Sequence, residues 1–195
     1  MDRRTLLAGV AGLGGVALVG CSSDPEPVTP RPTSDPPRTP APGPTSEPVD
    51  LAVAGTVATG LNVPWGLAFL PDGDALVSQR DAATLVRVST SGEVTELGPV
   101  PGVVPRGEAG LLGIALDPDD PTTLFAFTTT AGDDRILRMS VADGAIADVT
   151  PILTGIPVGS RHHGGRLLFD DDGMLFVSTG DAGRGETAQD RDALG

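Results

Sequence analysis

Apolar and polar residues follow a pattern that occurs three times after residue 50. Each copy has a short apolar run, then a turn rich in Asp, Gly or Pro, then a second apolar run. The first run and its turn occupy residues 66–73, 113–120 and 166–173, and the second run occupies residues 76–78, 124–127 and 175–178. Two short apolar segments joined by such a turn are typical of a β-hairpin. The pattern therefore predicts three hairpins.

The hairpins recur with a regular period. Phe69, Leu116 and Phe169 occupy equivalent positions about 50 residues apart. Further strand-like segments lie between the hairpins, at residues 84–88, 92–97 and 135–139, and no segment after the N-terminal apolar run has sustained helical periodicity with caps. About four short strands per repeat are typical of β-propeller blades, whereas a sandwich or a barrel needs no such period. We therefore predict an all-β fold, a partial β-propeller over residues 51–195.

The length of this region limits how much of a propeller it can form. Residues 51–195 are sufficient for about two to three blades, and a propeller needs about four blades to close. The chain also ends in residues 188–195 without a strand that would complete a blade. We therefore expect the sequence to be a C-terminally incomplete copy of a longer protein. The alternative is a small domain that closes by self-assembly.

Residues 1–21 have the pattern of an export signal. Arg3 and Arg4 precede an apolar run that ends at Gly20, about the length of a signal-peptide apolar region and short for a spanning helix. Residues 18–21, Leu-Val-Gly-Cys, resemble a bacterial lipobox, and Cys21 is the only cysteine in the chain. We predict a signal peptide with a lipobox, lipidation of Cys21, and an exported protein anchored to the outer face of the bacterial cytoplasmic membrane. An ordinary secretory signal or an N-terminal anchor is the alternative, and the arginine pair also resembles a twin-arginine signal.

Residues 22–50 have a different composition from the rest of the chain. Proline alternates there with Ser, Thr, Asp and Glu, and apolar residues are nearly missing from the segment. Such a composition cannot bury a core, and proline favours an extended polyproline-like conformation. We predict a disordered linker that holds the domain away from the membrane. A ligand for proline-recognition modules is the less favoured interpretation.

Composition narrows the range of partners. The formal net charge is −13 and the pI is near 4.3, and all 13 basic residues are arginine. Without a concentrated positive field, nucleic acid is not an expected partner, and an anionic substrate would be repelled on approach. One cysteine excludes a disulfide framework, and no Cys/His cluster has zinc spacing. A small neutral substrate fits this charge best.

Both histidines of the chain are adjacent, at His162 and His163, just before the third hairpin. Adjacent side chains on the approach to a strand point to opposite faces, so a shared metal is disfavoured, and solvated loop histidines are a plain alternative. Gly164 and Gly165 allow backbone or a cofactor to approach closely. Asp181 follows the same hairpin, whose two ends meet, so it is able to hold His162 in one tautomer as a base. A simple turn residue before glycine is the other interpretation of Asp181.

These residues also carry a family resemblance. The motifs are, in chain order, residues 64–69 (PWGLAF), 107–116 (GEAGLLGIAL), 162–167 (HHGGRL), 179–183 (TGDAG) and 188–190 (AQD). Together they resemble the pyrroloquinoline quinone (PQQ)-dependent soluble aldose dehydrogenases, also called the glucose/sorbosone dehydrogenase family. The resemblance covers nearly all of the predicted domain.

The resemblance implies a six-bladed propeller that binds PQQ in its axial mouth, with Ca²⁺ at the cofactor and in structural sites. His162 matches the general base of the family motif His-x-x-Gly-Arg-Leu, with His163 as the less favoured assignment, and Asp181 matches its aspartate partner. The implied reaction oxidises an aldose at the anomeric carbon to a lactone. Hydride passes to PQQ and then electrons pass to an external acceptor.

Two positions depart from the family pattern. Glu108 replaces a usual glutamine, which places a carboxylate where cofactor or sugar is contacted, and Arg161 replaces an acidic residue that precedes the base in glucose-preferring members. We predict cofactor contacts for Glu108, Arg161, Gly164 and Gly165. The metal ligands and the remaining PQQ contacts of the family fall after Gly195. The second hypothesis is a lipid-anchored propeller that binds a ligand without turnover.

Overall fold

The computed structural model describes residues 52–195, which form ten β-strands and one short 3-10 helix at Ala142–Gly144. The predicted signal peptide, its lipobox cysteine Cys21 and the whole proline-rich linker lie outside the described residues. Within residues 52–195 there is no helix long and apolar enough to cross a membrane.

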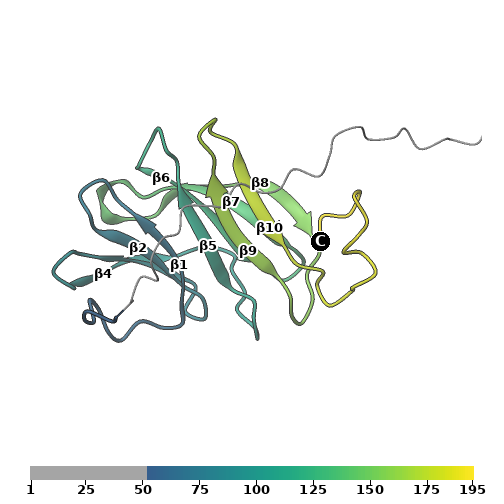
Figure 1. The fold of residues 1–195 in the computed structure, drawn as a ribbon, viewed down its shortest axis with the longest axis horizontal. Coiled ribbons are helices and arrows are strands. Elements are labelled where there is room, and N and C mark those ends of the chain that lie inside the picture. Colours follow the sequence, from purple (N-terminus) through teal and green to yellow (C-terminus); the bar gives the residue numbers. More distant parts are fainter. Residues whose placement is uncertain (1–51) are drawn as a thin grey trace, which may run out of the picture. The chain divides into compact units, whose positions relative to one another are not determined.

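Two four-stranded antiparallel sheets and one hairpin make up the fold (Figure 1). In both sheets, consecutive strands are hydrogen-bonded neighbours, which is the meander of a propeller blade. The expectation of a partial β-propeller is confirmed, with two complete blades and the inner hairpin of a third. The first blade has β1 (Pro64–Phe69), β2 (Ala75–Gln79), β3 (Thr84–Val88) and β4 (Val94–Pro99); the second has β5 (Leu111–Leu116), β6 (Thr123–Thr129), β7 (Asp134–Ser140) and β8 (Ala147–Ile156); the third has β9 (Gly164–Phe169) and β10 (Leu175–Thr179).

The repeat predicted from the sequence has a direct counterpart in the strands. Phe69, Leu116 and Phe169 are the last residues of β1, β5 and β9, and each is paired with the first or second residue of the following strand. In the first and third turns an aspartate at the hairpin closes the loop; Asp170 Oδ1, for example, accepts from the N–H groups of Asp172 and Met174. The acidic run at residues 170–172 is therefore a hairpin turn, as predicted.

The strand predictions between the hairpins were less accurate at one boundary. Residues 84–88 are β3, and residues 135–139 lie inside β7. The segment predicted at 92–97 forms a strand only from Val94 to Pro99, because Gly92 has a φ of +88° and belongs to the turn between β3 and β4.

The first strands of the three blades, β1, β5 and β9, pack against one another in succession, as innermost strands do around a propeller axis (Figure 1). Their approach is close at Gly66 and Gly113, where a Cβ atom would collide with the backbone of the neighbouring blade. Ser78 bridges the first two blades there, since its Oγ accepts from the Gly66 N–H at 2.7 Å and donates to the Leu112 carbonyl at 2.6 Å. The inner strands are thus held at backbone contact distance.

Apolar side chains fill the spaces between blades. One buried cluster joins the first and second blades, and a second cluster, built on Leu112 and Phe127, packs against Leu167 and Val177 of the third. Apolar side chains stay exposed at both ends of this row: Leu67 and Phe69 on the first blade, and Leu168 and Phe176 on the third hairpin. On the first blade this face is partly covered by residues 58 and 61, which pack against a small buried valine cluster. The members of the first cluster are Leu76, Leu85, Leu97, Val100, Leu111, Ile114, Leu124, Ala126, Leu137 and Met139.

Candidate functional site

The two histidines lie in the loop between β8 and β9, directly before Gly164, which begins β9. His162 has a φ of +60°, a left-handed conformation that is uncommon for a residue with a side chain. Such a conformation persists where surrounding contacts hold it, and it is concentrated at functional sites. The contacts of His162 therefore indicate what the loop is built to do.

The predicted contact between His162 and Asp181 is present. Nδ1 of His162 and Oδ1 of Asp181 are 2.9 Å apart, and the backbone supports them, since the Ala182 N–H donates to the His162 carbonyl at 3.3 Å. Because a carboxylate only accepts, Nδ1 carries the proton in this pair, and Nε2 of the neutral ring is left as an acceptor. The His162 side chain is 53% exposed, so this nitrogen is available to a ligand.

The surroundings of Asp181 keep it ionised and in place beside His162. The Gly183 N–H donates to its Oδ1 at 2.7 Å. This hydrogen bond and the one from His162 lower the pKa of Asp181 below its ordinary value, and the charge of Arg161 has a weaker effect in the same direction. Asp181 is therefore a carboxylate at neutral pH, which favours one ring orientation of His162 and stabilises its imidazolium.

Glu108 lies in the loop that precedes β5, and its side chain contacts the loop that carries the two histidines. It lies in a tight turn in which Arg106 and Ala109 exchange backbone hydrogen bonds. Its Oε2 accepts from the backbone N–H of His162 at 2.7 Å. The structure thus gives this carboxylate a partner within the protein, on the residue that carries the candidate base, and a contact with cofactor stays a prediction.

Arg161 lies on the Asp181 side of the loop. A Cβ built on Gly183 would be 3.6 Å from its Nε atom, and its charge contributes to the lowered pKa of Asp181. The role of Arg161 in cofactor binding stays a prediction.

Close packing explains why glycine occupies the two positions that follow the histidines. Gly164 and Gly165 have φ values of +73° and +97°, in the region that favours glycine. A Cβ on Gly164 would be 2.6 Å from the Thr179 carbonyl carbon, and one on Gly165 would be 3.0 Å from the Leu112 side chain. Their small size therefore serves close approach of protein atoms, and their predicted cofactor contact stays a prediction.

His163 differs from the expectation of a solvated loop histidine. Its side chain is 2% exposed, and its Nδ1 is 2.7 Å from Oδ2 of Asp134, itself fully buried at the start of β7. The alternation of side chains across the approach to β9 explains why one histidine is exposed and its neighbour buried. Sequence reasoning did not find Asp134; its only signal was an acidic residue at the start of a predicted strand.

A pocket of about 200 Å³ opens beside His162. Its walls combine an aromatic ring, a cation, a carboxylate and both histidines, so it offers polar contacts and a flat surface to a ligand. Arg166 stacks on the Trp65 ring at 4.0 Å from its centroid, and Trp65 is half-buried against the Leu112 cluster, so this tryptophan belongs to both core and pocket. The lining residues are Trp65, Arg80, Glu108, His162, His163 and Gly164.

Metal ligands are not gathered in this part of the chain. Within residues 52–195, no three His, Cys, Asp or Glu side chains form a group that could hold a metal ion. The expectation of calcium therefore still depends on the resemblance alone.

Comparison with known proteins agrees with the geometry. The Glucose / Sorbosone dehydrogenase family model matches residues 61–195. The chain is 33% identical over 146 residues to the aldose sugar dehydrogenase YliI of Escherichia coli K12, covering 69% of this chain and 39% of that protein. It is 27% identical over 149 residues to quinoprotein glucose dehydrogenase B of Acinetobacter calcoaceticus, covering 68% and 31%.

A solved structure gives the same result. The PQQ-bound aldose sugar dehydrogenase of Streptomyces coelicolor has a TM-score of 0.72 and 49% sequence identity, covering 74% of this chain and 46% of that one. The chain thus spans less than half the length of these relatives. The order of the motifs, the blade topology and the family match lead to one conclusion: the chain belongs to the glucose/sorbosone dehydrogenase family.

Proposed function

We propose that the protein to which this chain belongs oxidises an aldose sugar at the anomeric carbon to a lactone with PQQ, and that His162 is its general base. The observation that carries the proposal is the state of the His162 ring. Nδ1 is engaged by Asp181 at 2.9 Å, while the exposed side chain leaves Nε2 to a ligand in the adjoining pocket. A histidine in this state is a general base of the kind that alcohol oxidation needs.

Relatives support the class of reaction. They include an aldose sugar dehydrogenase and a quinoprotein glucose dehydrogenase, and the Streptomyces coelicolor structure is of the PQQ-bound form of an aldose sugar dehydrogenase. A neutral sugar also fits the net charge of −13, because an anionic substrate would be repelled.

The residues beside His162 fit an anionic, planar quinone. Trp65 brings a ring to the pocket, and Arg80 brings a guanidinium whose Nε is paired with Asp81 Oδ1 at 2.7 Å and whose other N–H groups are able to donate to a ligand. Glu108, the other charged residue of this wall, directs its Oε2 to the His162 N–H at 2.7 Å. Arg80 and Trp65 would therefore hold the cofactor in this part of the site.

The chemistry divides between cofactor and protein. PQQ, when bound, supplies a quinone that accepts the hydride from the anomeric carbon. His162 Nε2 takes the proton of the anomeric hydroxyl as its C–O bond becomes the lactone carbonyl. Asp181, held as a carboxylate by the Gly183 N–H, stabilises the resulting imidazolium. The sugar thus loses one proton and one hydride, and external electron acceptors would reoxidise the cofactor.

The proposed site of action is extracytoplasmic. The lipobox at residues 18–21 and the linker at 22–50 support an exported protein, lipid-anchored through Cys21 to the outer face of the cytoplasmic membrane. Calcium is proposed as a second cofactor on the family resemblance.

The test uses the full-length protein that contains this chain, loaded with PQQ and Ca²⁺, and measures dye reduction with a panel of aldoses. His162→Ala should lower kcat by about 10²- to 10⁴-fold, the usual contribution of a general base. Asp181→Asn should lower kcat as well, because the amide can present its N–H to Nδ1 and favour the wrong tautomer.

Asp171→Asn is the matched control, since Asp171 is exposed in the β9–β10 turn, and its kcat should equal that of the wild type. If the wild-type protein binds no PQQ and reduces no dye, the protein is a binding module and the proposed function is wrong.

A further inference from the structure

A second histidine–aspartate pair lies buried behind the exposed one. His163 Nδ1 and Asp134 Oδ2 are 2.7 Å apart, with side chains 2% and 0% exposed. Because the carboxylate accepts, Nδ1–H of His163 is the donor. A buried hydrogen bond of this kind resists exchange of partners, since breaking it would leave a buried carboxylate without compensation. The proposed reaction uses neither residue.

This pair is joined to the candidate base by one peptide bond. His162, with its φ of +60°, precedes His163 directly, and Gly164 and Gly165 follow with φ values of +73° and +97°. The two glycines have few intrinsic restraints, and the positive φ of His162 persists only where surrounding contacts hold it, so side-chain contacts decide where this backbone lies. The burial of His163 is therefore an anchor for the left-handed turn that presents His162.

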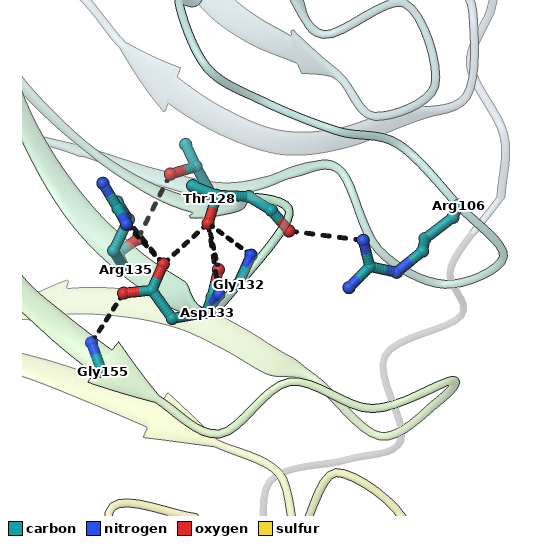
Figure 2. Close-up of polar contacts among 7 residues, drawn as sticks. Arg106, Thr128, Gly132, Asp133, Arg135 and Gly155 are labelled. Atoms are coloured by element: carbon teal, nitrogen blue, oxygen red, sulfur yellow. Dashed lines mark hydrogen bonds and ion pairs between the residues drawn. The ribbon is translucent and has the colours of Figure 1, made fainter.

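The partner strand is itself immobilised. Asp133, next to Asp134, accepts from Thr130 Oγ1 at 2.7 Å and from Arg135 at 2.6 Å through Oδ1, and from the Gly155 N–H at 2.8 Å through Oδ2 (Figure 2). These contacts tie the β6–β7 turn to the end of β8. Asp134 thus directly follows a turn that is hydrogen-bonded both within itself and to the end of β8.

The same turn also holds the segment that carries Glu108. Thr129 accepts from the Val104 N–H at 2.8 Å and donates its own N–H to the Gly110 carbonyl at 2.9 Å. Arg106 donates to the Thr130 carbonyl at 3.3 Å and reaches the turn from the side opposite to Arg135 (Figure 2). Glu108 holds the His162 N–H at 2.7 Å. The two anchors of the His162 loop therefore meet at this turn: Asp134 directly follows it as the first residue of β7, and the loop that carries Glu108 is hydrogen-bonded to Thr129 and Thr130.

We infer that His163 and Asp134 form a positioning pair that sets the place and orientation of the His162 imidazole for proton transfer. The inference rests on the proposed function, because it assigns the pair to that reaction. Displacement of a reacting group by about 1 Å lowers a rate about a hundredfold. Loss of the buried hydrogen bond should therefore affect kcat more than sugar binding.

The experiment compares two substitutions of His163 in the full-length protein. His163→Asn places an amide N–H where Nδ1 lies, so it keeps the hydrogen bond to Asp134, whereas His163→Leu keeps the apolar volume and removes the bond. We expect His163→Leu to lower kcat by about tenfold to a hundredfold with KM for the sugar unchanged, and His163→Asn to restore most of the loss. A merely structural role would instead lower thermal stability and leave the kcat of the remaining folded enzyme unchanged.

Results of three kinds would overturn the inference: wild-type kcat in His163→Leu, equal losses in both variants, or a loss that appears only in KM. If His163→Leu does not fold, His163→Gln replaces it, because its amide lies at the position of Nε2 and cannot make the bond. The same criteria then apply to that variant.

A second readout does not depend on PQQ. In the apo protein, ¹⁵N-labelled histidine should show a His163 Nδ1 proton that exchanges slowly with water, and His162 ring shifts that move in His163→Leu and return in His163→Asn. Rapid exchange of that proton, or unmoved His162 shifts, would refute the pair as a positioning device. If the wild type lacks dye reduction, the proposed reaction fails by itself, and these spectra still decide whether the pair positions His162.

Discussion

Substitution of Gly113 by alanine tests the close approach of the inner strands. Gly113 lies within β5, and a Cβ there would overlap the Gly165 carbonyl oxygen, lying 3.1 Å from its carbon and 3.3 Å from the Arg166 Cα. All three atoms belong to the backbone of β9, so no side-chain rotation relieves the contact. We therefore expect β5 and β9 to move apart in Gly113→Ala.

The cost follows from the packing between these strands. Separation loosens the cluster of Leu112 and Phe127 against Leu167, and overpacking of a well-filled core costs about 1–3 kcal/mol. Reduced freedom of the unfolded chain returns about 0.4–1 kcal/mol when Gly becomes Ala. The net loss should be about 1–2 kcal/mol, which lowers Tm by about 2–8 °C in a domain of this size.

Gly132→Ala is the matched control. Gly132 lies in the β6–β7 turn outside the left-handed region, and a Cβ there would have nothing within 4 Å. Both variants thus share the effect on the unfolded chain and differ in the clash. Thermal unfolding of the full-length protein, followed by circular dichroism, measures the difference. A Tm for Gly113→Ala equal to or above that of Gly132→Ala would refute the reasoning.

Two further predictions concern other parts of the chain. Burial raises the pKa of Asp133, but hydrogen bonds from Thr130, Gly155 and Arg135 outweigh it and hold the pKa below 3.8. The stabilisation by the Asp133 carboxylate is therefore present above that pH and lost as the pH falls through the lowered pKa. The free energy of unfolding in urea should accordingly vary less with pH below about pH 4 in Asp133→Asn than in the wild type. Parallel pH curves for the two proteins would contradict this prediction. Cys21→Ser should move the native protein from the membrane fraction to the soluble fraction, detected by immunoblotting, and an unchanged distribution would exclude Cys21 as the anchor.

The order of apolar and polar residues along the chain was enough to predict the hairpins and the contact between His162 and Asp181. An apolar run, an acidic turn and a second apolar run specify a hairpin through contacts within a few residues, so Phe69, Leu116 and Phe169 mark the ends of equivalent strands. The contact of His162 with Asp181 follows from the same cause, because both residues lie at the open end of the β9–β10 hairpin. The boundary at residues 92–97 was wrong because the turn chemistry of Gly92 outweighed strand propensity.

Contacts between blades needed the tertiary structure. Glu108 reaches the His162 N–H from 54 residues away, and Arg166 donates to the Trp65 carbonyl across 101 residues. The pairing of His163 with Asp134 also joins different blades, and it buries a histidine for which a solvated loop position was one of the alternatives from the sequence.

The sequence by itself determined the all-β class, the repeat of about 50 residues and the hairpin that brings His162 and Asp181 together. These depend on side-chain alternation and turn residues, which act over short distances along the chain. The tertiary structure decided which histidine is buried, what Glu108 binds and how the β6–β7 turn supports the His162 loop. Such contacts depend on how neighbouring blades pack against each other. The distance between two blades is set by all the side chains that fill the space between them, which lie far apart in the sequence.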